Sequence, residues 1–387
     1  MTALQDIADQ PQILLMILIA AGLLYLGIKK QYEPLLLVPI AFGMLLANFP
    51  GGQMGVVKID ENLTLYQIAK EHGIMNYLYY ALIKTGFLPP IIFLGVGALT
   101  DFGPMLRNLR LAFFGAAAQI GIFTVLISAV ALGFTLKEAA SLGIIGGADG
   151  PTAIYTTIKL APHLLGPIAI AAYSYMALVP VIIPFVVRFT VTEKELKINM
   201  KEQDKLYPSN TPIKNLQTLK IIFPIAVGTL VALLVPSSVP LIGLLMFGNL
   251  IKEIGPMVSR LHQAASQTIL NAATIFLGLS VGATMTVKAF LNMETLLIIA
   301  GGFVAFAISI AGGILAVKAY NLFAKKKINP LIGATGLSAV PMASRVANDI
   351  ALKHDPNNHL LQYAMASNIS GVIGSAVAAG VLISFLG

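Results

Sequence analysis

Long apolar runs separated by short polar segments make up most of this chain. Such runs predict helices that cross a bilayer, because about 20 apolar residues span its hydrocarbon core. Ten runs occur, at 13–28, 34–48, 74–100, 111–136, 164–187, 221–235, 238–251, 263–287, 295–317 and 359–386. Two shorter stretches, 138–160 and 329–352, are interrupted by glycine and proline. We expect these two stretches to be broken-helix re-entrant hairpins.

The composition fits an all-α polytopic membrane protein. Of 387 residues, 57% are hydrophobic and 11% charged, and the mean hydropathy is +0.84. A soluble domain carries about 25% charged residues. The absence of cysteine excludes disulfides, thiolate metal sites and cysteine nucleophiles, and the five histidines lack the spacing of transition-metal ligands. The net charge of +8 lies in short loops, so it indicates topology and not nucleic-acid binding.

The two halves of the chain resemble each other in motif and in order. The matching pairs are FLGVGALT (93–100) with FLGLSVGAT (276–284), AFGMLL (41–46) with MFGNLI (246–251), GADGPTA (147–153) with GLSAVPM (336–342), and YSYM (173–176) with ASNI (366–369). A polar linker, 190–218, separates them. We therefore expect two membrane repeats, 1–189 and 219–387, each with about five transmembrane helices and one hairpin.

The distribution of lysine and arginine predicts that the repeats are inverted. Short loops rich in these residues face the cytoplasm. Five basic clusters share that side if both termini face outside: Lys29–Lys30, Arg107 with Arg110, the lysines of the linker, Lys252 with Arg260, and Lys318 with Lys325–Lys327. Lys58 and Lys70 do not fit this scheme. The first hairpin then opens to the outside and the second to the cytoplasm, and they meet near the midplane.

Asp149 is the only charged residue between Ala139 and Lys159. A carboxylate within the hydrocarbon layer costs several kcal/mol and is rarely there without a function. The glycines and the proline around it break the helix and free backbone carbonyls. Carbonyls beside a buried carboxylate form an oxygen-lined pocket of negative charge. Such a pocket suits a cation, typically sodium or a proton.

Four long motifs closely resemble the membrane-embedded beta subunit of the sodium-pumping biotin-dependent decarboxylases. They are GGADGPTAIY (146–155), AYSYMALVPVIIP (172–184), NPLIGATGLSAVPMASRVAND (329–349) and MASNISGVIGSAVAAG (365–380). The family includes the oxaloacetate, methylmalonyl-CoA, glutaconyl-CoA and malonate decarboxylase pumps. The resemblance implies a subunit that decarboxylates carboxybiotin, consumes a proton and exports sodium across the bacterial cytoplasmic (inner) membrane.

The same resemblance implies the partners of the chain. A carboxyltransferase alpha subunit would load biotin, which a biotin carrier subunit would supply in trans. A small membrane subunit of gamma or delta type and a homo-oligomeric assembly are also implied. The motifs leave the soluble substrate open among the four acids and acyl-CoAs.

The family's functional positions are all present in this chain. The resemblance assigns roles to Asp149, Tyr175, Asn329, Gly333, Ser338 and Arg345. We expect Asp149, Asn329, Ser338 and Asn368 to supply oxygen ligands to sodium, together with Tyr175 and with Gly333, which allows close backbone approach. Tyr175 and Asp149 are also catalytic candidates, with Tyr175 as a proton donor or relay. The fork of Arg345 matches the carboxylate of carboxybiotin.

Four of these candidates also have a purely structural interpretation. Asp149 could cap or pair helices, and Arg345 could form an i,i+4 bridge with Asp349. Asn368 could join helices, and Tyr175 could belong to an interfacial belt. Asp101 is expected to be a loop or cap residue.

Two other function classes fit parts of the pattern. A sodium-coupled secondary transporter of an organic anion would share inverted repeats, broken hairpins and a midplane carboxylate. A structural anchor for soluble subunits would not explain a buried aspartate and arginine. Dependence on a biotinylated partner separates the pump from the transporter.

Overall fold

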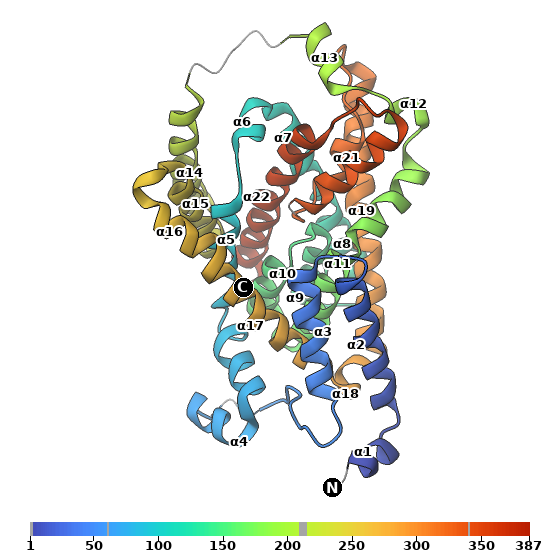
Figure 1. Cartoon of the computed structure of the whole chain (residues 1–387), viewed down its shortest axis with the longest axis vertical. Coiled ribbons are helices and arrows are strands. Elements are labelled where there is room, and N and C mark those ends of the chain that lie inside the picture. The colour runs from blue at the N-terminus through green and yellow to red at the C-terminus, as the bar shows by residue number, and fades with distance from the viewer. Residues whose placement is uncertain (1–2, 60–61, 209–214, 340) are drawn as a thin grey trace.

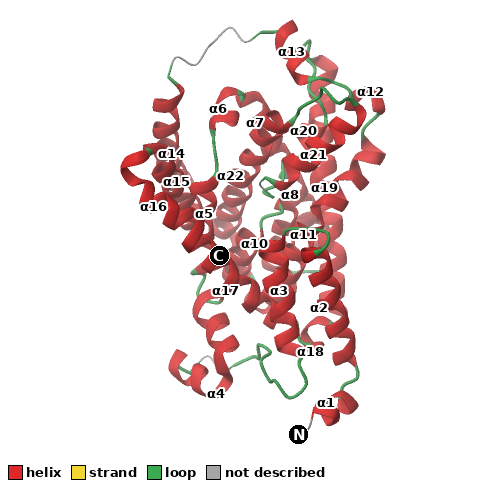
Figure 2. Cartoon of the chain, viewed as in Figure 1, coloured by secondary structure: helices red, strands yellow, loops and turns green. Residues whose placement is uncertain are grey.

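The computed structural model describes residues 3–59, 62–208, 215–339 and 341–387, and these residues form helices and loops without strands (Figure 1 and Figure 2). The first half contains α1 (Ala3–Asp9), α2 (Gln12–Ile28), α3 (Pro34–Asn48), α4 (Leu65–Leu78), η1 (Tyr79–Ile83), α5 (Leu88–Leu99), α6 (Gly103–Arg107), α7 (Leu109–Ala118), α8 (Ile120–Ala131), α9 (Leu136–Gly143), η2 (Ile144–Gly147), α10 (Gly150–Leu160), η3 (Pro162–Leu164) and α11 (Leu165–Thr190).

The remainder contains α12 (Glu193–Leu196), α13 (Met200–Leu206), α14 (Leu216–Leu234), η4 (Pro236–Ser238), α15 (Val239–Ile254), η5 (Pro256–Val258), α16 (Ser259–Gln263), η6 (Ala264–Ile269), α17 (Leu270–Ala283), α18 (Val287–Phe290), α19 (Met293–Phe323), α20 (Leu331–Ala334), α21 (Met342–His354) and α22 (Leu361–Leu386).

The ten predicted apolar runs are all helical. Within the described residues, six helices are long and apolar enough to cross a membrane. Two further runs are helix pairs bent by 69°, Leu65–Ile83 with Leu88–Leu99 and Pro162–Met176 with Leu178–Thr190. The other two runs are the shorter apolar helices α2 and α3. Together these helices confirm the all-α polytopic membrane fold.

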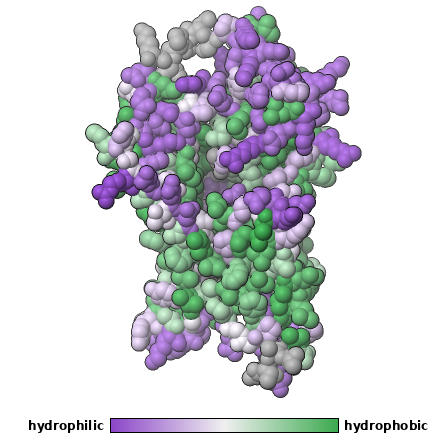
Figure 3. All heavy atoms as spheres, in the orientation of Figure 1, coloured by the Kyte–Doolittle hydropathy of each residue, from purple (hydrophilic) through white to green (hydrophobic). Residues whose placement is uncertain are grey.

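The outer surface separates apolar from polar regions. In Figure 3, apolar residues gather on the lower half of the visible face, over α2 and α3. Polar residues gather toward the upper end, over α21 and the linker helices α12 and α13. A broad apolar surface of this kind is what a lipid-facing helix bundle presents.

Two glycines bring α5 and α15 into backbone contact. A Cβ added at Gly97 of α5 would lie 1.9 Å from the carbonyl oxygen of Leu245. A Cβ added at Gly248 of α15 would lie 2.0 Å from the carbonyl oxygen of Leu94. Each glycine therefore faces a residue three positions before the other glycine, and no side chain fits between the helices.

The same arrangement joins α3 to α17. A Cβ at Gly282 of α17 would lie 2.1 Å from the carbonyl oxygen of Ile40, and a Cβ at Gly43 of α3 would lie 2.4 Å from that of Leu279. These positions match those of the α5–α15 contact in the two sequence motifs that repeat. Each contact joins the first half to the second, and exchanging the two halves converts one contact into the other. The orientation of the two units relative to the membrane stays a prediction.

The polar linker is bonded to the second half of the chain. Asp204 of α13 accepts hydrogen bonds from Lys326 Nζ at 2.6 Å and from the Tyr363 hydroxyl at 2.6 Å. Glu195 of α12 pairs with Lys318 of α19 at 3.2 Å. The linker segment 209–214 lies outside the described residues.

Both predicted hairpins are helix–break–helix segments. The first comprises α9, the 3-10 turn η2 and α10, and its break lies at Ala148 and Asp149. Ala148 has φ +56°, a left-handed conformation that costs energy for a residue with a Cβ. The second comprises α20 and α21, and residues 335–339 between them are not helical.

Candidate functional site

Asp149 occupies the break of the first hairpin and uses both carboxylate oxygens. It is the N-cap of α10, and its Oδ1 accepts a hydrogen bond from the backbone N–H of Thr152 at 3.2 Å. Its Oδ2 accepts from the hydroxyls of Ser338 at 2.8 Å and Ser375 at 2.9 Å. The side chain is 5% exposed. Asp149 therefore does cap a helix, but one of its oxygens faces two hydroxyls from other elements.

The tips of the two hairpins meet at this carboxylate. The backbone N–H of Ser338 donates to the carbonyl oxygen of Gly147 at 3.0 Å, in addition to the side-chain bond to Asp149. Ser375 reaches the same carboxylate from α22. Three elements that are far apart in sequence thus converge on one buried negative charge.

Asn368 fastens the second hairpin to α22. Its amide nitrogen donates to the carbonyl oxygen of Leu337, directly before Ser338. Its Oδ1 accepts from the hydroxyl of Ser344 in α21 at 3.1 Å. Asn368 is fully buried, and its bond to Leu337 places it beside the tip that contacts Asp149. In this structure Asn368 therefore links α22 to the second hairpin.

Several buried oxygens close to this junction have no hydrogen-bond partner within the described residues. They include Oε1 of Gln119, the hydroxyl of Tyr173 and Oγ of Ser309. Gln119 lies between α7 and α8, and its amide nitrogen donates to the carbonyl of Gly336 in the second hairpin at 3.3 Å. A Cβ at Gly147 in the first hairpin would lie 3.7 Å from Gln119 Oε1.

The electrostatic character of the site follows from these contacts. In the part of the chain that the structure describes, no Lys, Arg or His side chain forms an ion pair with Asp149. The groups that bond its carboxylate are neutral: the hydroxyls of Ser338 and Ser375 and the backbone N–H of Thr152. Unsatisfied buried oxygens cost free energy, which a bound cation would offset. The donor set fits a hard monovalent cation such as sodium.

Tyr173, and not Tyr175, packs against the Asp149 segment. The ring of Tyr173 is 1% exposed and covers Gly150, where an added Cβ would lie 2.4 Å from it. Tyr175 turns toward α19, where its hydroxyl donates to the carbonyl oxygen of Ile299. Two residues apart on a helix, the two rings point to opposite sides, because each residue turns the helix by about 100°.

Asn329 and Gly333 are occupied by packing at the start of the second hairpin. The amide nitrogen of Asn329 donates to the carbonyls of Leu196 and Ile198 in the linker, both at 3.0 Å. Gly333 contacts Gly313 of α19, and a Cβ there would lie 2.1 Å from the Gly313 carbonyl oxygen. Neither forms a hydrogen bond with Asp149 here, so their role as sodium ligands stays a prediction.

Arg345 lies exposed on α21, in the arm of the second hairpin that follows the tip. In the described residues it forms no ion pair with Asp349, so the i,i+4 bridge considered as an alternative is not formed. Burial raises the pKa of Glu33, and the positive charge of Arg345 acts in the opposite direction. The Glu33 carboxylate therefore lies within electrostatic range of the guanidinium, although the two form no ion pair within the described residues.

The remaining sequence expectation concerns Asp101. Its Oδ1 accepts from the backbone N–H of Gly103 at 2.9 Å, at the start of α6, and pairs with Lys220 at 2.6 Å. Burial opposes ionisation of Asp101, but the bonds from Lys220 and Gly103 hold its pKa below the ordinary value. The prediction of a loop or cap residue is confirmed, since Asp101 lies in the loop before α6, whose N-cap is Phe102.

Sequence reasoning missed Ser375, Gln119 and Tyr173 as neighbours of Asp149. A signal existed for Gln119, since it is the only amide side chain in the apolar run 111–136. Ser375 gave no such signal, because a serine among alanines and glycines is ordinary in closely packed membrane helices.

Comparisons with known proteins match almost the whole chain to one family. Residues 12–386 match the family model described as the Na⁺-transporting oxaloacetate decarboxylase beta subunit. The chain is 51% identical over 385 residues to the methylmalonyl-CoA decarboxylase subunit beta of Propionigenium modestum, covering 97% of this chain and 95% of the relative. It is 44% identical over 419 residues to the oxaloacetate decarboxylase beta chain 2 of Salmonella typhi, covering 96% and 94%. The subunit beta of Veillonella parvula methylmalonyl-CoA decarboxylase is 47% identical over 372 residues, with 96% and 92% covered.

Proposed function

Because the chain belongs to the family of beta subunits of Na⁺-transporting decarboxylases, we propose that it decarboxylates carboxybiotin and couples this reaction to sodium export. As a beta subunit of a Na⁺-translocating decarboxylase, the chain belongs to a multi-subunit complex. Its apolar helices make it a multi-pass membrane protein. The proposal adds the carboxybiotin step, the proton and the sodium site.

One observation carries the proposal: Asp149 Oδ2 lies between the hydroxyls of Ser338 and Ser375, at 2.8 and 2.9 Å. Both hydroxyl oxygens can turn a lone pair toward a cation when their protons rotate away. The carboxylate supplies the charge, and Gln119 Oε1 and the Tyr173 hydroxyl are further neutral oxygens nearby. Sodium would take the place that the hydroxyl hydrogens now occupy beside the carboxylate, with both serines still protonated, and would keep the hairpin tips together.

Carboxybiotin decarboxylation breaks the bond between the carboxyl carbon and a ureido nitrogen of biotin. Carbon dioxide leaves, and the nitrogen takes a proton. Arg345 would bind the departing carboxylate through two parallel N–H bonds. Tyr175 would relay the proton, for which its hydroxyl must release the Ile299 carbonyl.

Arg345 and Ser338 belong to one hairpin, which gives a physical route for coupling. A change in the position of α21 when the carboxylate at Arg345 is lost would move Ser338 relative to Asp149. The loss of one hydroxyl ligand would lower the affinity for sodium and favour its release.

The partner subunits and the membrane in which the complex lies are proposed from membership of the family. A carboxyltransferase alpha subunit, a biotin carrier and a small membrane subunit would complete the complex in the bacterial inner membrane. The relatives' names differ in substrate, methylmalonyl-CoA or oxaloacetate, so the proposal is limited to the carboxybiotin step.

Reconstitution tests this function against secondary transport. The purified chain in liposomes should move no sodium with an organic-anion gradient alone. Addition of the carboxylated carrier should start sodium movement and release carbon dioxide. Sodium movement driven by the anion gradient without the carrier would instead identify a secondary transporter.

A further inference from the structure

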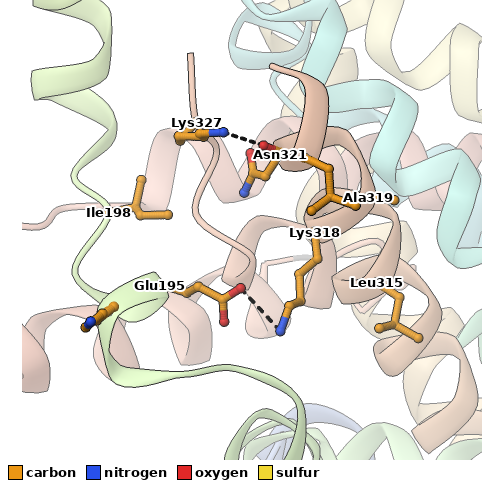
Figure 4. A pocket seen from close by; sticks show the side chains of 9 residues that line it. Glu195, Ile198, Leu315, Lys318, Ala319, Asn321 and Lys327 are labelled. Atoms are coloured by element: carbon orange, nitrogen blue, oxygen red, sulfur yellow. Dashed lines mark hydrogen bonds and ion pairs between the residues drawn. The ribbon is translucent and has the colours of Figure 1, made fainter. Parts of the chain in front are cut away.

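A pocket of about 680 Å³ lies where the linker helix α12 crosses the end of α19 (Figure 4). None of its lining residues takes part in the hydrogen bonds of Asp149. Lys194 and Glu195 line one wall, and Lys318, Leu315 and Leu322 of α19 line another. Lys327, after the end of α19, also lines it.

The pocket carries an excess of positive charge. Its charged lining residues are three lysines and one glutamate, which leaves two positive charges. Glu195 pairs with Lys318 at 3.2 Å, and Lys327 donates to the Asn321 carbonyl at the end of α19. Lys194 is exposed and has no hydrogen bond or ion pair within the described residues. Its ammonium therefore has no protein partner to compete with an anion.

The α19 wall of the pocket carries two exposed leucines beside Lys318. Leu315 is 57% and Leu322 is 78% exposed. A soluble anion such as inorganic phosphate would gain nothing from these leucines. A ligand with a negative head and an apolar tail would use both walls.

The apolar wall continues along the outer surface of α19. Leu297, Val304, Leu315 and Leu322 are all exposed, and their spacings of seven and eleven residues place them on one face of the helix. From the pocket at Leu315 back to Val304 this stripe extends about 17 Å, close to the thickness of one leaflet of the hydrocarbon core. The pocket therefore opens onto the surface that faces lipid acyl chains.

We propose that this pocket binds the phosphate headgroup of an anionic phospholipid, with the acyl chains extending along α19 from Leu315 toward Val304. Basic pockets at the cytoplasmic ends of membrane helices are suited to such headgroups. The bound lipid would join α12 to α19 and so hold the linker against the second half. This inference does not depend on the decarboxylase reaction.

Native mass spectrometry of the full chain tests the proposal. The protein is released from detergent micelles that contain phosphatidylcholine and an increasing fraction of phosphatidylglycerol, and bound lipids are identified. Phosphatidylglycerol should be retained in preference to phosphatidylcholine. Lys194→Gln should weaken its binding about fivefold, the contribution of one lysine near the headgroups. Glu195→Gln should tighten it, because the charge excess rises.

The matched control is Lys197→Gln, which removes the same charge from an exposed position of the linker that does not line the pocket. It should leave lipid retention unchanged. Thermal unfolding with inorganic phosphate alone should show no stabilisation, whereas phosphatidylglycerol should raise the midpoint of the wild type. The proposal is overturned by equal retention of both lipids, by equal effects of Lys194→Gln and Lys197→Gln, or by stabilisation with phosphate alone.

Discussion

The Ser338 hydroxyl lies 2.8 Å from Asp149 Oδ2, although 189 residues separate the two along the chain. The bond joins the tips of the two hairpins at a buried carboxylate, and Ser375 of α22 bonds the same oxygen at 2.9 Å. Movement of the second hairpin therefore changes the surroundings of the only charge at the break of the first.

Removal of either hydroxyl should weaken the sodium site. Ser338→Ala and Ser375→Ala each delete a neutral oxygen and a bond to a charged group, which contributes about 1.5–3 kcal/mol. We expect sodium affinity, measured by sodium-dependent thermal stabilisation, to fall at least tenfold in each variant. Ser370→Ala is the control, since its hydroxyl bonds the Ala112 carbonyl on another face of α22. Unchanged affinity in both test variants would contradict the ligand assignment.

Arg345→Lys should impair chemistry more than sodium binding. A lysine keeps the charge but cannot bind a carboxylate through two parallel bonds. We expect the rate of carboxylated-carrier turnover to fall by the equivalent of about 2–4 kcal/mol, with the sodium-dependent stabilisation retained.

Asp349→Asn separates this role from a structural pair on α21. Because Arg345 and Asp349 form no ion pair in this structure, Asp349→Asn should turn over like the wild type. Normal turnover of Arg345→Lys, or equal damage from the two substitutions, would refute the carboxylate-binding role.

The glycine contacts between the halves should not tolerate a methyl group. A Cβ at Gly97 or Gly282 would lie 1.9 or 2.1 Å from a backbone carbonyl oxygen, so the helices must separate. We expect Gly97→Ala and Gly282→Ala each to destabilise the protein by about 1–3 kcal/mol or more. Gly22→Ala is the matched control, because nothing lies within 4 Å of its added Cβ. Thermal unfolding in detergent measures all three, and equal midpoints would disprove the contact.

The ion pair that fastens the linker should be sensitive to acid. Burial opposes ionisation of Glu195, but hydrogen bonds from Thr192 and the Lys318 ammonium hold its pKa below the ordinary value. The stabilisation is therefore complete above the unfolded pKa of about 4.3 and is lost as the pH falls through the lower folded pKa. Glu195→Gln should lower the unfolding free energy by about 1 kcal/mol or less at neutral pH.

This difference between Glu195→Gln and the wild type should shrink below about pH 4, where the wild-type carboxylate becomes protonated. Unfolding midpoints measured across this range provide the test. Glu193→Gln, an exposed neighbour, should show no such dependence. A difference that stays constant down to pH 3 would mean that the charge of Glu195 contributes nothing.

The helical spans and the polar candidate at Asp149 could be predicted from sequence because both depend on local composition. Apolar runs of span length and a lone carboxylate among glycines are visible without knowledge of packing. The break at Ala148 and Asp149 also follows from the local glycine and proline content.

The partners of Asp149 could not be predicted in the same way. Which of Tyr173 and Tyr175 faces the carboxylate depends on the rotation of α11 about its axis. Apolar residues occur on every side of α11, so its sequence does not indicate which side faces the hairpin. Asn329 binds linker carbonyls because the linker folds back on the second half, which its polar composition does not indicate. Ser375 reaches Asp149 only through the packing of α22 against the hairpins.

The most direct test of sodium coupling through Asp149 is radiolabelled sodium uptake into inverted proteoliposomes driven by carboxylated carrier. Asp149→Asn keeps the shape of the side chain and the cap of α10 but removes the charge that binds the cation. Wild-type vesicles should accumulate sodium in step with carbon dioxide release, and Asp149→Asn vesicles should accumulate none at the sodium concentration that saturates the wild type. Sodium uptake by Asp149→Asn at the wild-type rate would show that the cation crosses the membrane without this carboxylate.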